Sequence, residues 1–276
     1  MPHLRLLDLF SGIGGFSYAA DRIVGGYRTV QFVEREPFCQ KILRKHWPDV
    51  PIHDDITTFQ PAPGSADVVC GGFPCQDISQ AGKGAGITEG TRSGLFFELL
   101  RVVRLVRPQF VVLENVSAIT YRGLDTVLGS LAEAGFDAEW ACIPASAVGA
   151  CHRRDRWWCV AYPQREQRHD VRCQGPSQQA KPQPRDGHGP TTDPLRLRLE
   201  GPDQLAVCRP QWPAAPARLS PEWRRYASQP VICRGDDGFS GRVDRLKALG
   251  NAVVPQVAAI PMARVLELAV QAELAC

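Results

Sequence analysis

Short apolar runs alternate with amphipathic segments over the first 160 residues of the chain. Apolar runs typical of strands cover 4–9, 28–34, 66–70 and 110–113. Between the last two of these, apolar residues recur every three or four positions over 94–106, which is the spacing of one helix face. This β–α alternation predicts an α/β protein built on a parallel, doubly wound sheet.

Further helices are predicted over 15–24, 36–46, 124–134 and 255–274. Two more strands, 138–143 and 156–161, are expected to pair as a hairpin and to add an antiparallel strand to the sheet. A short strand is expected just before Asp54 and Asp55.

The periodicity fails after Tyr162 and returns near residue 243. We therefore predict one folded domain formed by 1–162 plus 243–276, and a short irregular region over 163–242. The net charge is +3, but 163–230 alone hold 11 Lys/Arg against 7 Asp/Glu, together with 12 of the 23 prolines. A basic, Pro-rich insert suits either a nucleic-acid-facing element or a solvated linker, and composition leaves both open.

Ten cysteines occur without a CxxC pair, which favours reduced thiols in a cytoplasmic protein over disulfides or a zinc site. The chain enters its first strand at Leu4 without a signal-peptide layout, and no apolar run of membrane-spanning length is expected.

The apolar run 66–70 leads into Gly71, Gly72, Phe73, Pro74 and Cys75. A strand with this ending delivers a cysteine to the carboxyl edge of the sheet, where open α/β folds bind their ligands. The glycine-rich stretch 76–92 then suits a flap that closes over a site. A lone cysteine is more often a buried thiol before an ordinary loop, so this reading needs support from the rest of the chain.

A glycine turn follows the first strand, with Gly12 and Gly14 in place, but Ser17 stands where a dinucleotide fingerprint has its third glycine. Small residues still allow close backbone approach, and the helix that follows attracts a ligand carboxylate. Glu34 ends the next strand, where an acid can bind a ribose diol, and Asp55 could accept an adenine amino group.

Apolar walls for this pocket would come from Phe10, Ile56 and Leu95. The alternative is an ordinary glycine turn beside solvated acids. Acids at the ends of successive strands weaken that alternative, because those ends meet at one edge of the sheet.

Five motifs occur in a characteristic order: Asp8–Phe16 (DLFSGIGGF), Gly72–Gln76 (GFPCQ), Glu114–Val116 (ENV), His152–Arg156 (HRRDR) and Gly250–Pro255 (GNAVVP). In this order they resemble the DNA (cytosine-5)-methyltransferase family of prokaryotic and phage type. The likeness covers roughly 3–162 and 243–276.

The resemblance implies a Rossmann-like, S-adenosyl-L-methionine-dependent catalytic domain and a small target-recognition domain, with double-stranded DNA between them. It implies that Cys75 is the nucleophile, that Glu114 contacts the target ring, and that Arg154 and Arg156 hold the flipped base. Cofactor positions carried over by the resemblance, together with the glycine turn, are Phe10, Gly12, Gly14, Glu34, Asp55, Ile56, Leu95, Asn251 and Ala252.

Three departures from the family pattern stand out. His152 replaces the usual Gln, Arg35 replaces an aromatic residue that often covers the adenine, and the recognition region is short. A catalytically silent DNA- or cofactor-binding relic is therefore an alternative to an active enzyme. Methylation of tRNA is a weaker one, because the Cys-Phe-Thr tripeptide of that branch is absent. A cognate restriction endonuclease cannot be inferred from the sequence.

Overall fold

A computed structural model describes residues 3–74, 94–164, 212 and 248–274. Cys75, the predicted flap and nearly all of 163–242 lie outside these residues. Within them, seven strands form one sheet in the order β3-β2-β1-β4-β5-β7-β6. The strands are β1 (Leu4–Leu9), β2 (Tyr27–Val33), β3 (Ile52–His53), β4 (Val68–Gly72), β5 (Phe110–Val116), β6 (Phe136–Pro144) and β7 (Asp155–Pro163).

The pairing confirms a doubly wound sheet with one late antiparallel strand. β1 pairs in parallel with β2 and β4, and β4 pairs in parallel with β5. β7 is antiparallel to both β5 and β6, as the predicted hairpin requires. The prediction that the fifth strand ends at Leu113 was wrong, because Glu114, Asn115 and Val116 continue the ladder with β7.

The predicted helices are present, with ends shifted by at most one residue. The first changes type along its length, from an α-helical turn to a π-helix, η1. Two 3-10 turns, η2 and η3, were not predicted. The helical elements are α1 (Gly15–Tyr18), η1 (Ala19–Val24), α2 (Pro37–His46), α3 (Leu95–Val106), η2 (Ser117–Tyr121), α4 (Leu124–Glu133), η3 (Ala145–Val148) and α7 (Pro255–Leu274).

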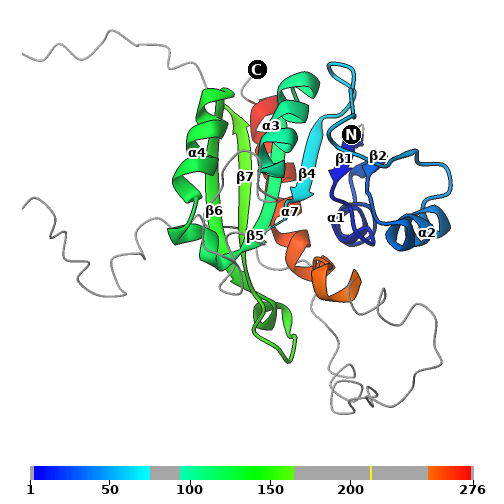
Figure 1. Cartoon of the computed structure of the whole chain (residues 1–276). Coiled ribbons are helices and arrows are strands. Elements are labelled where there is room, and N and C mark those ends of the chain that lie inside the picture. The colour runs from blue at the N-terminus through cyan, green and yellow to red at the C-terminus, as the bar shows by residue number, and fades with distance from the viewer. Residues whose placement is uncertain (1–2, 75–93, 165–211, 213–247, 275–276) are drawn as a thin grey trace, which may run out of the picture. The chain divides into compact units, whose positions relative to one another are not determined.

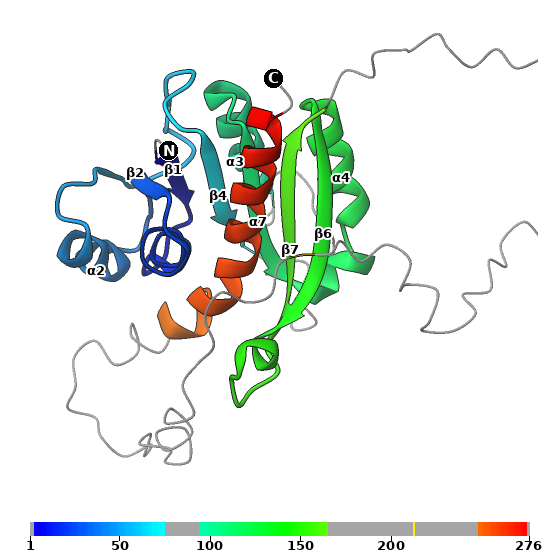
Figure 2. The same ribbon diagram turned by 180° about the vertical axis from the view of Figure 1, so that it is seen from behind.

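Two apolar clusters fill the two faces of the sheet. One includes Leu7, Val69 and the inner faces of α3 and α4. The other includes Leu6, Val68 and the inner faces of α1, η1 and α7. Successive strand residues point to opposite faces, so adjacent positions feed different clusters. Figures 1 and 2 show α3 and α4 on one side of the sheet and α7 on the other.

The segment Ala248–Ala272 is long and apolar enough to span a membrane by length and composition, with a mean hydropathy of 1.5. This differs from the expectation that no run would qualify. Within this segment, however, Val257, Ala258 and Met262 are buried in the second apolar cluster. Core helices of this kind satisfy the same test.

The chain divides into two compact units, Met1–Gln164 with Pro210–Cys276, and Arg165–Arg209. The second unit lies wholly outside the described residues. The predicted division at 162 and 243, and the recognition role of 163–242, therefore remain predictions.

Candidate active site

The glycine turn after β1 is held in a conformation that favours glycine. Gly12 and Gly14 have φ of 54° and 84°. A Cβ at Gly14 would lie 2.7 Å from the ring of Trp47, and one at Gly15 would lie 2.9 Å from the carbonyl oxygen of Val253. At Gly12, by contrast, a Cβ would meet nothing within 4 Å. The turn is thus tightly packed at Gly14 and Gly15 but open at Gly12, where a ligand can approach the backbone.

Ser17, which breaks the dinucleotide fingerprint, has a structural role. Its hydroxyl donates to Oδ2 of Asp8 at 2.7 Å, and both residues are buried. Burial raises the pKa of Asp8 to about 7, while the bonds from Ser17 act in the opposite direction. A glycine at position 17 would leave this carboxyl without that donor.

Glu34 directly follows β2 and is buried. Its Oε2 accepts from the N–H of Gly12 at 2.6 Å, and its Oε1 accepts from the N–H of Glu36 at 2.7 Å. Burial raises the pKa of Glu34, and these backbone bonds oppose the rise. Each oxygen keeps a further lone pair for a ligand hydroxyl. Glu34 therefore also fixes the glycine turn against the start of α2.

A cavity of about 340 Å³ opens beside these groups at the carboxyl edge of the sheet. It brings together seven of the predicted site residues, namely Phe10, Gly12, Glu34, Glu114, Arg154, Arg156 and Asn251. Phe38, whose contribution was not predicted, and Arg35 also line it. Phe38 thus supplies an aromatic ring to a cavity in which Arg35 takes the place of the expected aromatic residue.

The other predicted cofactor residues lie outside this cavity. Gly14 and Ala252 line an adjoining cavity of about 480 Å³. Ile56 is buried in the first apolar cluster, against which Phe10 and Leu95 pack. Asp55 lies in the loop after β3, with its Oδ1 bonded to Thr57.

Glu114 and Arg156 form an ion pair within the cavity, with Nε and Oε1 3.0 Å apart. Burial raises the pKa of Glu114 to about 7, against the opposing effects of Arg156 and Arg154. Gly72 pairs with Glu114 across the β4–β5 ladder. A Cβ at Gly72 would lie 2.9 Å from Oε2 of Glu114, so the missing side chain makes room for the carboxyl group.

Arg154 joins two motifs that are about 100 residues apart in the sequence. Its Nη2 donates to the carbonyl oxygens of Gly250 and Ala252 at 2.9 and 2.8 Å. The residue adopts a φ of 36°, which is strained for a side chain other than glycine. Desolvation, followed by the neighbouring Arg156, lowers its pKa. Arg154 therefore anchors the segment before α7 at the edge of the cavity.

Asn115 is a functional candidate that the sequence did not assign. Its side chain is buried, and its Nδ2 donates to the carbonyl oxygen of Phe73 at 3.1 Å, while Oδ1 accepts from the N–H of Val116. Phe73 lies two residues before Cys75. The signal in the sequence was the asparagine between Glu114 and Val116, because the side-chain amide of a buried asparagine needs hydrogen-bond partners for both its NH2 group and its oxygen.

A doubly wound sheet with an open glycine turn, a strand-end acid and a half-buried Glu–Arg pair at one edge is consistent with the fold of S-adenosyl-L-methionine-dependent methyltransferases. Comparison with known proteins identifies the family. Residues 4–199 match the C-5 cytosine-specific DNA methylase family, and the chain belongs to that family. Its members use S-adenosyl-L-methionine as the methyl donor.

Among curated relatives, the Type II methyltransferase M.CviJI of Paramecium bursaria Chlorella virus IL3A is 36% identical over 160 residues, covering 57% of this chain and 42% of that protein. M.HpaII of Haemophilus parainfluenzae is 34% identical over 174 residues, covering 58% and 48%. The chain thus spans less than half the length of these relatives. A solved structure of the S. pombe Dnmt2 methyltransferase aligns with a TM-score of 0.48 and 21% identity, over 58% of this chain and 50% of that one.

Proposed function

We propose that this protein transfers a methyl group from S-adenosyl-L-methionine to C5 of a cytosine in double-stranded DNA, in the cytoplasm. The observation that carries the proposal is the half-buried Glu114–Arg156 pair in the same cavity as the open glycine turn. Base chemistry and cofactor binding would then share one site.

The residues present fit the cofactor. Gly12 offers an open backbone approach, Glu34 offers acceptors for ribose hydroxyls, and Phe10 and Phe38 offer aromatic walls. Asn251 lines the same cavity and would border the methionyl end. When bound, the cofactor supplies an electrophilic methyl group on a sulfonium centre.

Cytosine C5 is a weak nucleophile until the ring is activated. In the proposed mechanism the Cys75 thiolate adds to C6, which makes C5 enamine-like and able to form a bond to the methyl carbon. The bond between that carbon and the sulfonium sulfur would break at the same time, leaving S-adenosyl-L-homocysteine. A base then removes the C5 proton, and the C6–S bond breaks to release the thiolate. In a duplex the neighbouring base pairs cover both faces of the ring, from which C6 must be attacked, so the cytosine must be flipped out.

Glu114 and Arg156 would serve the ring during this addition. A carboxyl group with a pKa of about 7 retains a proton near neutral pH and can share it with ring N3. Arg156 would hold Glu114 in place and stabilise the charge that develops on the exocyclic oxygen. Asn115 would fix the backbone just before the nucleophile through Phe73.

Sequence readout is assigned to 163–242, whose surplus of basic residues suits phosphate attraction. The test is incubation of the full chain with unmethylated plasmid and labelled S-adenosyl-L-methionine, followed by bisulfite sequencing. We expect label in DNA and protected cytosines in a fixed context. Cofactor binding by calorimetry without transfer to any mixed-sequence DNA would instead support a silent relic.

A further inference from the structure

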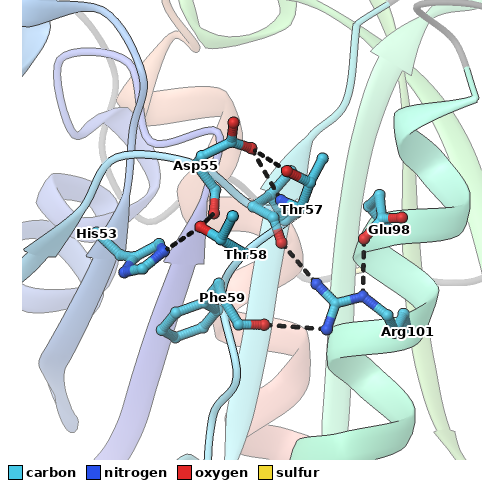
Figure 3. A network of polar contacts seen from close by, with 8 residues as sticks. His53, Asp55, Thr57, Thr58, Phe59, Glu98 and Arg101 are labelled. Atoms are coloured by element: carbon cyan, nitrogen blue, oxygen red, sulfur yellow. Dashed lines mark hydrogen bonds and ion pairs between the residues drawn. The ribbon is translucent and has the colours of Figure 1, made fainter.

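Arg101, in α3, uses all three nitrogens of its guanidinium, two of them to bind the loop that follows β3 and one to bind its own helix (Figure 3). Its Nη2 donates to the carbonyl oxygen of Ile56 at 2.6 Å and its Nη1 to that of Phe59 at 3.0 Å. Its Nε pairs with Oε2 of Glu98 at 2.7 Å, one turn earlier in the same helix. Its side chain is 29% exposed, so these bonds are partly desolvated.

The loop held by Arg101 is ordered around Asp55. Oδ1 of Asp55 accepts from the N–H and the hydroxyl of Thr57 at 2.9 and 2.8 Å. The hydroxyl of Thr58 donates to the Asp55 carbonyl oxygen and contacts Nε2 of His53 (Figure 3). The backbone bond from Thr57 lowers the pKa of Asp55, so the carboxylate is ionised at neutral pH. These bonds use Oδ1, so Oδ2 retains its capacity to accept a hydrogen bond from a ligand.

Arg101 also links this loop to the helix that carries Leu95. Leu95 lies six residues earlier in α3 and packs against the apolar cluster that contains Ile56, as does Phe10. The guanidinium bonds therefore fix the distance between the element that carries Asp55 and Ile56 and the element that carries Leu95. Within the described residues, no other side chain forms a hydrogen bond between these two elements.

We propose that Arg101 is a positioning residue for the adenosine end of the cofactor, which it does not touch. It acts by holding Asp55 and Ile56 at a fixed distance from Leu95. This inference rests on the proposed function, because it assumes that these three residues receive the adenine. A lysine has a single ammonium group and cannot bind two carbonyls and a carboxylate in this planar arrangement.

The test is calorimetric binding of S-adenosyl-L-homocysteine and of 5′-methylthioadenosine, which shares the adenosine end but lacks the amino acid. We expect Arg101→Met to raise both Kd values by about tenfold, the scale of one lost charge-assisted bond. Arg101→Lys should give a smaller rise. In methyl transfer, KM for S-adenosyl-L-methionine should rise while kcat changes by less than about twofold.

Arg264→Met is the matched control. Arg264 also pairs through Nε with a glutamate, Glu139, at 2.7 Å, and its side chain is 20% exposed. Neither residue lines the cavity. The control should lose comparable thermal stability and keep both Kd values.

An irreversibly unfolded fraction lowers the calorimetric stoichiometry, whereas reversible unfolding raises the apparent Kd by the reciprocal of the folded fraction, which thermal melts supply for each variant. If Arg101→Met does not fold, Arg101→Lys decides the question. Unchanged Kd values in a folded Arg101 variant, or equal losses in the Arg264 control, would overturn the inference. Absence of binding by the unsubstituted chain would overturn the proposed function instead.

Discussion

Nε of Arg156 lies 3.0 Å from Oε1 of Glu114, and the two side chains come from strands that run in opposite directions. Arg156 is in register with Val116, two residues beyond Glu114. Residues two apart on a strand share a face, so the sheet itself brings the pair together diagonally. The pair then needs no flexible loop to form.

Replacement of Glu114 by Gln should lower kcat for methyl transfer by at least ~100-fold, because an amide cannot transfer a proton to the ring. Cofactor affinity should remain within about twofold. In the unsubstituted protein, kcat should fall as pH rises through about 7, where Glu114 loses its proton. Single-turnover rates between pH 6 and 9 check this.

Glu139→Gln is the control for that variant, since Glu139 forms a similar arginine pair and its side chain is likewise 15% exposed. It should keep full activity. An equal loss of activity in both variants would show that replacing Glu114 acts through folding rather than through proton transfer.

Gly72→Ala should impair catalysis because the new Cβ would lie 2.9 Å from Oε2 of Glu114. We expect kcat to fall by ~10-fold or more, since a displaced catalytic group loses its alignment. Gly129→Ala, in α4, meets nothing within 4 Å and should be neutral or stabilising by up to ~1 kcal/mol. Steady-state kinetics and thermal melts of the two variants test this contrast.

Asn115→Ala should lower kcat while leaving the cofactor Kd intact. The substitution removes the donor that binds the carbonyl oxygen of Phe73, and the backbone ahead of Cys75 loses that restraint. We expect the rate of single-turnover methyl transfer to fall by ~10-fold or more. A change in Kd with an unaltered rate would contradict the assigned role.

Asp8 should make stability depend on pH. Its pKa is raised from 3.8 to about 7 in the folded protein, so its contribution is fully present below pH 3.8 and is lost as pH rises through about 7. The free energy of unfolding should decline by at most ~1.4 kcal/mol per pH unit within this window. Asp8→Asn should flatten the decline in urea melts at pH 5 to 8. If the free energy of unfolding of Asp8→Asn declined with pH as steeply as that of the unsubstituted protein, the raised pKa of Asp8 would be contradicted.

Much of the fold was predictable because the first 160 residues alternate cleanly between strand and helix periodicities. Helix α7 was predicted with both of its ends. The strand ending at Leu113 was misjudged, because Glu114 and Asn115 are polar residues that enter the ladder through pairing with β7. Local polarity cannot reveal a pairing partner 40 residues away.

The site was predictable where a short motif determines the local backbone conformation, as at Gly12 and Gly14. It was not predictable where a bond joins distant segments. Arg154 reaches the carbonyls of Gly250 and Ala252, and Arg101 reaches that of Ile56. Carbonyl acceptors occur at every residue, so the sequence gives no sign of which ones a given arginine will bind.

The most direct test of the account is nucleoside mass spectrometry of plasmid DNA after incubation with S-adenosyl-L-methionine and either the unsubstituted chain or Cys75→Ala. The account predicts 5-methylcytosine with the unsubstituted chain and none with the variant. Equal 5-methylcytosine from Cys75→Ala, or methylation at the exocyclic nitrogen in place of C5, would contradict it.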